Sequence, residues 1–360
     1  MEAQHKPVDR EGQPLCIGLD VHLKSWTVTI RGAGTELAHF NAPPDAGALA
    51  THLRRRYPGA AYRSVYEAGF CGFAPHRALE QQGIHNLVVH SPDVPTTHKE
   101  KLAKEDHRDS RKLARELENS NLGGIYIPNP AHEHLRALCR ARHRLAADGR
   151  RLKCRIRALF HTAGISLPPN EVLKHWSRRF ITHIETFARG NEPWVLSLRT
   201  WLDALNDHRR QMTVLTRRLR ACVRRDGDPE TVRLLTSIPG IASISATTLV
   251  CELIDMDRFH STDQLASLVG LVPNTHSSGD SDVPRGLTGR ANPFLRHLLI
   301  EAAWTAVRTD PGLQRTFLRL SRRMRKTQAI VRIARRVLNR VRCVWKNRRP
   351  YRLGTSPEEI

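Results

Sequence analysis

Four carboxylates stand at points of the chain where an acid is costly or is paired with another acid. Asp20 lies inside the apolar run of residues 16–22, and Glu67 ends another predicted strand. Asp106 and Asp109 are three residues apart, which places both on one face at the start of a helix. Converging carboxylates repel one another unless a cation lies between them, and Mg²⁺ takes oxygen ligands. Two such ions about 3.5–4 Å apart hold both oxygens of a phosphodiester exchange, so these acids indicate a magnesium-dependent phosphodiester site.

Each acid also has a simpler interpretation. Asp20 could cap a turn at the end of its strand, and Asp106 and Asp109 suit the positive end of a helix dipole. A carboxylate within an apolar strand is nevertheless costly unless something offsets its charge. In a chain this basic, an acid cluster is also hard to explain as a solvated face. We therefore favour the metal site.

The segments around these acids predict an α/β domain over residues 14–125. Apolar and polar residues alternate over residues 26–31, the pattern of a half-buried strand. Asp45 can cap one helix, a second helix contains Leu79, and a third continues from Asp109 through Leu113 and Leu117. Strands are expected at residues 16–22, 26–31, 36–40, 62–68 and 84–90. The order strand, strand, strand, helix, strand, helix, strand is that of the ribonuclease-H-like fold, with parallel pairs in a central sheet.

The composition narrows the class of partner. The 360 residues carry a formal net charge of +23, which favours a nucleic acid first and an anionic membrane surface second. No apolar run approaches the length of a membrane span, about 18 residues, and the mostly polar first fifteen residues argue against a signal peptide. The seven cysteines lie far apart without metal-binding spacing. We expect free thiols in a reducing cytoplasm.

Two long helices are predicted in the middle region, residues 126–230. Leucines and other apolar residues recur every three or four positions over residues 135–159 and again over 194–223. The two helices could pair as an antiparallel hairpin or pack against a second copy of the chain. His208 falls on the apolar stripe, where we interpret it as a packing residue and not as a metal ligand.

The last region, residues 231–350, predicts a mainly helical domain. Apolar residues flank a tight turn at Pro239 and Gly240, the pattern of a helix-hairpin-helix, with Ser243 or Ser245 as the cap of the second helix. Such a hairpin offers backbone N–H groups to a phosphate, which makes Gly240 a candidate nucleic-acid contact. The tail, residues 317–352, predicts one or two basic helices. Its buried stripe comprises Ile330, Ile333, Val337, Val341 and Val344, and its arginines, among them Arg335, Arg336 and Arg340, are expected to face RNA or DNA.

Three segments of the first domain resemble the acidic motifs of the DEDD transposases, at residues 18–22, 66–69 and 104–109. These insertion-sequence enzymes combine a RuvC-like N-terminal domain with a C-terminal serine domain and are understood as bridge-RNA-guided recombinases. The resemblance implies that Asp20, Glu67, Asp106 and Asp109 bind Mg²⁺. Ser110 stands where the family usually has a small Ala.

Residues 270–273, 278–279 and 286–296 are similar to the signature of the same family's serine domain. On composition alone, the polar loop 271–279 is ordinary, because Ser and Gly are common in loops. The resemblance implies a catalytic serine, best placed at Ser278 with Ser277 as the alternative. Arg285, Arg290 and Arg296 could stabilise the phosphate, or they could be solvated loop arginines. Ala242 and His276 depart from the family's usual Gly and aromatic residue.

The resemblance implies an enzyme that cuts and rejoins DNA through a 5′-phosphoserine intermediate. Its implied partners are the DNA ends of the element, the DNA target, a guide RNA and further copies of the chain, with no membrane. One alternative is a hydrolytic structure-specific nuclease, such as a Holliday-junction resolvase, which needs the acids but not Ser278. The other is an inactive relative that only binds nucleic acid.

Overall fold

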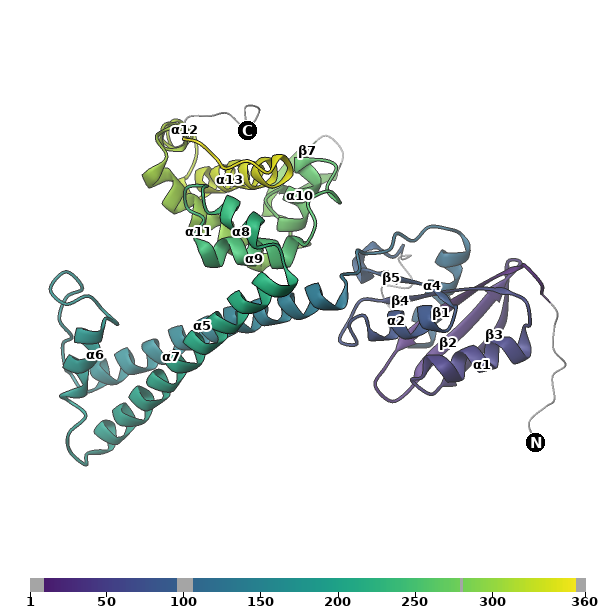
Figure 1. Cartoon of the computed structure of the whole chain (residues 1–360), viewed down its shortest axis with the longest axis horizontal. Helices are drawn as coiled ribbons and strands as arrows, with labels where there is room; N and C mark the ends of the chain where they lie inside the picture. Colours follow the sequence, from purple (N-terminus) through teal and green to yellow (C-terminus); the bar gives the residue numbers. More distant parts are fainter. Residues whose placement is uncertain (1–9, 96–105, 279–280, 354–360) are drawn as a thin grey trace. The chain divides into compact units, whose positions relative to one another are not determined.

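The computed structural model in Figure 1 describes residues 10–95, 106–278 and 281–353, with side chains left out of the description at residues 106–108, 274–278 and 281–285. The chain forms two compact units, Met1–Ile127 and Pro128–Ile360. The predicted boundary near residue 126 lies beside this division. The predicted boundary at residue 230 lies within the second unit and stays a prediction.

The first unit contains a five-stranded sheet in the order β3-β2-β1-β4-β5. Its strands are β1 (Pro14–Val21), β2 (Trp26–Gly32), β3 (Thr35–Ala42), β4 (Ala61–Glu67) and β5 (His85–Val89). β2 runs antiparallel to both β1 and β3, whereas β1, β4 and β5 are parallel to one another. The five predicted strands are therefore confirmed, and this mixed sheet fits a ribonuclease-H-like domain.

Helices cover both faces of this sheet. α1 (Ala46–Arg56) and α2 (Ala74–Gln81) pack on one face, where Leu53 and Leu79 meet Ile17 of β1. α4 (Asp106–Glu118) packs on the other face, where Leu113 meets Cys16. Neighbouring residues of β1 are thus buried on opposite faces, as expected for a central strand with a two-residue period. The predicted Asp45 cap of α1 is confirmed, because its Oδ1 accepts the Gly47 N–H at 2.7 Å.

Two long helices open the second unit. They are α5 (Pro130–Thr162) and α7 (Pro193–Asp226), with the short helix α6 (Arg178–Glu185) between them. Arg142 of α5 contacts Thr216 of α7, whereas Leu145 contacts His208, so the two helices run antiparallel and pack against each other within one chain. Of the two predicted arrangements, the structure has the intramolecular hairpin, which can be followed in Figure 1.

The crossing of α5 and α7 depends on one glycine. A Cβ on Gly149 would lie 2.8 Å from the His208 Nε2, and closer still to Cε1 of that ring. The His208 Nε2 also lies 2.7 Å from the Leu145 carbonyl oxygen. Thus His208 is a packing residue at the helix crossing, as the sequence indicates, and its ring occupies the space that a larger residue at position 149 would take.

The remaining elements form a layer of helices and one hairpin. They are α8 (Pro229–Leu235), α9 (Ser243–Leu253), α10 (Thr262–Val269), β6 (Pro273–Ser278), β7 (Ser281–Leu287), α11 (Pro293–Thr309), α12 (Pro311–Ser321) and α13 (Lys326–Asn347). The predicted apolar stripe of α13 is confirmed, because Ile330, Ile333, Val337, Val341 and Val344 are all buried in one core. Within the described residues, no helix is long and apolar enough to cross a membrane.

Three local predictions for this layer are wrong. Neither Ser243 nor Ser245 caps α9: the N-cap is Ala242, without a side-chain hydrogen bond, because the helix begins one residue earlier than a serine cap requires. Residues 273–278, part of the stretch 271–279 that was expected as a loop, form strand β6 of the β6–β7 hairpin. Arg340, expected on the basic surface, is 8% exposed. Its burial follows from a buried partner, since the Arg340 Nη1 donates to Asp310 Oδ2 at 2.7 Å.

Candidate active site

Asp20 and Glu67 come together through the register of two parallel strands. Leu19 of β1 lies opposite Tyr66 of β4, so the next residue of each strand, Asp20 and Glu67, stands at the same carboxyl edge of the sheet. The Asp20 side chain is 22% exposed, and its Oδ2 lies 3.1 Å from the His22 Nε2. Two carboxylates on adjacent strands therefore face a partly open edge.

α4 lies against β1 because residue 18 is a glycine. A Cβ at Gly18 would overlap the carbonyl oxygen of Ser110 and would stand 2.6 Å from the backbone nitrogen of Ala114. The Ser110 side chain is fully buried, and its Oγ lies 2.9 Å from the Thr29 Oγ1. The serine that departs from the family's small residue thus has a hydroxyl partner, and it fixes the first half of α4 to β2.

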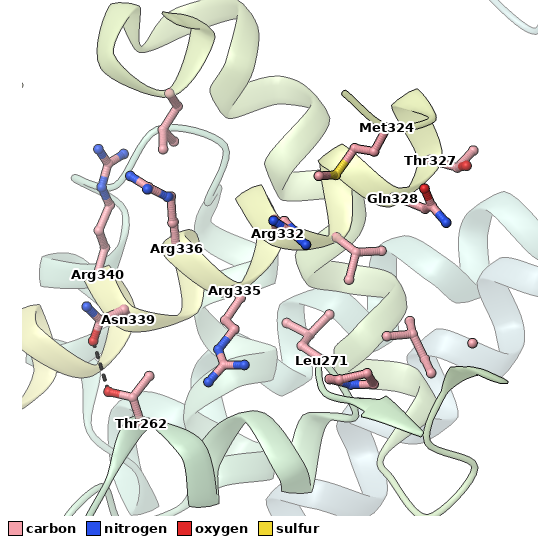
Figure 2. Close-up of a pocket in the computed structure, with 15 residues that line it drawn as sticks. Thr262, Leu271, Met324, Thr327, Gln328, Arg332, Arg335, Arg336, Asn339 and Arg340 are labelled. Carbon is pink, nitrogen blue, oxygen red and sulfur yellow. Dashed lines mark hydrogen bonds between the residues drawn. The ribbon is translucent and has the colours of Figure 1, made fainter. Parts of the chain in front are cut away.

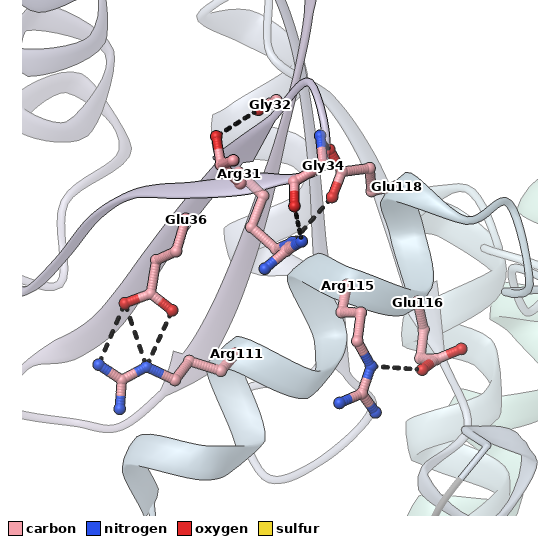
Figure 3. Close-up of polar contacts among 9 residues, drawn as sticks. Arg31, Gly32, Gly34, Glu36, Arg111, Arg115, Glu116 and Glu118 are labelled. Atoms are coloured by element: carbon pink, nitrogen blue, oxygen red, sulfur yellow. Dashed lines mark hydrogen bonds and ion pairs between the residues drawn. The ribbon is translucent and has the colours of Figure 1, made fainter.

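The other end of α4 is fixed by an ion pair. The Glu118 Oε2 accepts the Arg31 Nε–H at 2.8 Å, and Oε1 accepts the Gly34 N–H at 2.8 Å, as Figure 3 shows. Burial raises the pKa of the Glu118 carboxyl, but these two donors outweigh burial and hold that pKa below its ordinary value. Arg31 lies opposite Cys16, near the start of β1. Glu118, which is bonded to Arg31, therefore lies close to the start of β1.

These anchors set the direction of α4. Ser110 lies beside Gly18, whereas Glu118 lies toward the start of β1, so the helix runs antiparallel to that strand. Its first turn therefore points to the end of β1 that carries Asp20. Asp109 belongs to this first turn. The structure thus brings three predicted acids to one edge of the sheet by backbone geometry.

The metal-binding arrangement itself stays a prediction. Among the described side chains, no three His, Cys, Asp or Glu residues gather closely enough to hold a metal ion. Asp106, the first residue of α4, has a side chain outside the described residues, so the set of four acids is not described as a whole. The donors that are described are carboxylate oxygens, which suit a hard divalent ion.

The predicted serine lies on the β6–β7 hairpin of the second unit. Ser278 ends β6 and is paired with Ser281, and Ser277 is paired with Asp282. The side chains of Ser277, Ser278 and Arg285 lie outside the described residues. The choice between the two serines therefore stays open.

The two described arginines of this region differ in setting. The Arg296 Nη2 donates to the Thr288 carbonyl oxygen at 2.7 Å, and its guanidinium lies directly over Gly270. It therefore braces the segment that follows β7, which supports a positioning role. Arg290 is exposed on the same segment, where its charge is accessible to an anion.

Gly240 is needed for packing within the unit. Its φ is +89°, and a Cβ on it would lie 2.9 Å from the Ala302 carbonyl carbon of α11 and nearer still to the carbonyl oxygen. The turn between α8 and α9 is thus pressed against α11. Close packing against α11 is by itself a sufficient reason for glycine at this position. The predicted contact between Gly240 and a phosphate therefore stays a prediction.

One structurally important acid was missed in the sequence. Glu252 of α9 is 2% exposed, and its two oxygens accept the Arg140 Nε–H at 2.7 Å and the Nη2–H at 2.9 Å. Its Oε2 also accepts the Asn292 Nδ2–H at 3.0 Å. Glu252 therefore ties α5 and the start of α11 to α9. The available signal was a single acid inside an apolar helix, which requires a buried partner.

Comparisons with known proteins match two separate stretches of the chain. A family model for DEDD transposases of the IS110 type, described as "Transposase", matches residues 17–164, and the model "Transposase IS116/IS110/IS902 family" matches residues 232–318. The first match contains Asp20, Glu67, Asp106 and Asp109, and the second contains Ser278.

Three curated relatives are similar over much of the chain. "Putative transposase y4rJ" of Sinorhizobium fredii is 27% identical over 92% of this chain and 90% of its own length. "Putative transposase y4qE" of the same organism is 27% identical over 67% of this chain and 57% of its own length. "Transposase for insertion sequence element IS1111A" of Coxiella burnetii is 25% identical over 66% and 64%. The match thus spans less than two thirds of two of these relatives.

Proposed function

We infer the function from the premise that the chain belongs to the DEDD-type transposases of the IS110 family. We propose that it cuts and rejoins the DNA of an insertion sequence with a divalent metal, most simply Mg²⁺, and a serine nucleophile, and that an RNA guides it. The observation that carries the proposal is the β1–β4 register, which sets Asp20 beside Glu67 at the edge to which the first turn of α4 points.

The acids and the serine have separate roles in this proposal. Asp20, Glu67, Asp106 and Asp109 hold the divalent ions, which supply charge stabilisation to the phosphate oxygens. The Ser278 Oγ attacks the phosphorus and loses its proton, and the bond to the 3′ oxygen breaks as that oxygen gains a proton. The DNA is then joined to the protein through a 5′-phosphoserine. Attack by a 3′ hydroxyl on this ester restores the phosphodiester and frees the serine.

Target choice and assembly belong to the same proposal. A guide RNA pairs with the DNA, so base pairing and not side chains carries the sequence information. The net charge of +23 supports two polyanionic partners. The acids lie in the first compact unit and the hairpin serine in the second, and the proposal includes assembly of the chain into a homo-oligomer.

A covalent-trapping experiment tests the serine chemistry. Full-length protein, Mg²⁺, co-expressed RNA and labelled element-end DNA are incubated and separated on a denaturing gel. We expect a DNA-linked protein band that disappears in Ser278→Ala and in Asp20→Ala. Ser267→Ala, at an exposed serine of α10 in the same unit, serves as the matched control and should retain the band.

Each other outcome selects a different reaction. An adduct that persists in Ser278→Ala and disappears in Ser277→Ala moves the nucleophile by one residue. Cleavage without any adduct, unaffected by Ser278→Ala, identifies a hydrolytic nuclease, which the separate location of the acidic edge allows. Binding without cleavage in every lane would leave a protein that only binds nucleic acid.

A further inference from the structure

A cavity of about 960 Å³ lies beside the base of the β6–β7 hairpin, which carries Ser277 and Ser278 and is named the serine hairpin below. One wall is α13 and another is the start of α10, from which Thr262 points toward Asn339 (Figure 2). A third wall is formed by Pro273 of β6 and Leu287 of β7. The hydrogen bond from Thr262 Oγ1 to Asn339 Oδ1, 3.1 Å long, joins the first two walls. The volume is at the upper end for a small-molecule pocket.

The lining of this cavity combines two kinds of side chain. Leu271, Val331 and Met324 provide apolar lining, which is named the aliphatic floor below. α13 adds four arginines, Arg332, Arg335, Arg336 and Arg340, which Figure 2 shows projecting from that helix. A cavity lined by both apolar side chains and arginines fits a ligand that is itself apolar in one part and anionic in another.

Two of these arginines have their charge balanced by the protein. Arg340 is buried against Asp310 and stacks on the Tyr351 ring, with 4.5 Å between the guanidinium carbon and the ring centroid. Arg335 pairs with Asp263 of α10. Neither is therefore the principal source of free positive charge in the cavity.

Arg332 and Arg336 are in a different position. Both side chains are exposed and line the cavity, and neither has an acidic partner among the side chains that the structure describes. They are four residues apart on one helix, so the two like charges repel each other. An anionic group between them would relieve that repulsion.

We propose that this cavity binds unpaired DNA a few nucleotides away from the phosphate that the hairpin serine attacks. Backbone phosphates lie on Arg332 and Arg336, and a base lies over the aliphatic floor. The inference rests on the proposed serine cleavage of DNA, because the hairpin connects the two places. β6 has six residues, so at about 3.3 Å per residue its last residue, Ser278, lies about 16 Å along the strand from Pro273.

Unpaired DNA fits this cavity better than a duplex does. In a duplex the bases are stacked inside and the apolar floor would face only the backbone, whereas an unpaired strand presents both its bases and its phosphates to a groove. Arginine planes also stack on exposed bases. A strand must leave its duplex during exchange, so single-stranded DNA is the substrate form that the site would hold.

Binding of a fluorescent single-stranded DNA by the full-length chain tests the inference. We expect the double variant Arg332→Ala/Arg336→Ala to weaken binding about tenfold and to reduce the slope of log K against log salt by about two, one for each lost phosphate contact. Arg178→Ala/Arg179→Ala removes the same charge from two exposed arginines of α6 and should change the affinity less than twofold. Arg332→Lys/Arg336→Lys should recover most of the affinity, because it keeps the charge.

Binding measurements with two further kinds of nucleic acid identify the ligand. A strand of the same length with abasic sites should bind the wild-type protein more weakly than the normal strand, because the aliphatic floor loses its base. Duplex DNA and RNA of the same sequence should lose less affinity than single-stranded DNA when Arg332 and Arg336 are replaced. Equal losses in the α6 control, no effect of abasic sites, or a larger loss for RNA would each overturn the proposal.

The assay separates this inference from the proposed function. Binding is measured with Ser278→Ala protein in buffer without divalent metal, where no cleavage takes place. A failure to form the covalent adduct therefore cannot imitate a failure of the cavity to bind DNA. Conversely, normal formation of the adduct by Arg332→Ala/Arg336→Ala at low DNA concentration would refute DNA binding by the cavity and would leave the proposed serine cleavage intact.

Discussion

The acidic edge of the first unit and the arginine-rich layer of the second are held together in different ways. At the acidic edge, regular backbone geometry places the side chains: a parallel register sets Asp20 beside Glu67, and a glycine lets α4 approach. In the second unit, buried ion pairs between distant segments join the helices, as Glu252 does with Arg140. Each region also contains the other kind of contact, since Arg31 pairs with Glu118 in the first unit and Gly240 packs closely against α11 in the second. Gly18 and Glu252 are therefore compared as the main supports of the two regions.

The largest effect that can test this contrast is on catalysis. Replacing Asp20 with Asn removes a charge needed to hold the ions, and a loss of several kcal/mol of charge stabilisation corresponds to at least about a hundredfold lower cleavage rate. The fold should remain intact, because relief of repulsion with Glu67 offsets the lost contact to His22. Single-turnover cleavage and thermal unfolding measure the two properties separately. A variant that is unfolded, or one that cleaves normally, would refute the role of Asp20 at this edge.

Gly18→Ala should give the largest loss of stability in the first unit. The new Cβ overlaps the α4 backbone at Ser110, and overpacking of this kind costs about 3 kcal/mol. Gly123→Ala is the matched control, because a Cβ at Gly123 has no neighbour within 4 Å. Urea unfolding followed by circular dichroism compares them. Equal stability of the two variants would show that α4 does not need the close approach.

Glu252→Gln tests the corresponding support in the second unit. The change removes the carboxylate that Arg136 and Arg140 both contact, and we expect a loss of about 2 kcal/mol, less than for a fully buried pair because Arg140 is half exposed. Asp263→Asn breaks the exposed pair with Arg335 and should cost under about 0.5 kcal/mol. Denaturant titrations read from tryptophan fluorescence give both values. Similar costs would remove the distinction between buried and surface pairs.

The smallest expected effect is on the stability of the fold at low pH, through Asp310. Burial raises the pKa of the Asp310 carboxyl, but the Leu313 N–H, the Tyr351 hydroxyl and Arg340 together hold it below its ordinary value of 3.8. The stabilisation from this lowered pKa is therefore fully present above pH 3.8 and is lost as the pH falls toward the folded-state pKa. Asp310→Asn should flatten this part of the stability profile, as measured by thermal unfolding between about pH 2 and about pH 5. An unchanged acid slope would mean that other carboxylates dominate it.

The sequence predicts best those features that depend on neighbouring residues. Period-two alternation located the strands, Asp45 located a helix start, and the apolar spacing from Ile330 to Val344 located the buried side of α13. These signals are local, because the side chains of a strand or helix return to the buried face at a fixed interval along the same element.

Features that depend on distant residues were missed or misplaced. Arg340 looks like any other arginine of its helix until Asp310 is brought beside it by the fold. The segment that forms β6 was expected as part of a loop, because Ser and Gly are common in loops. Its pairing partner β7 lies further along the chain and gives no signal within residues 271–279.

The His208 ring of α7 fills the space beside Gly149 of α5, and this contact fixes the position of one helix along the other. A shift of one helix along the other would drive the imidazole into a neighbouring side chain, so the register of the α5–α7 hairpin is fixed at one point. Its length then depends only on how many residues lie on either side of that contact, at about 1.5 Å for each residue. Insertion or deletion of whole turns away from Gly149 would therefore change the length of the α5–α7 hairpin without changing its contact at His208.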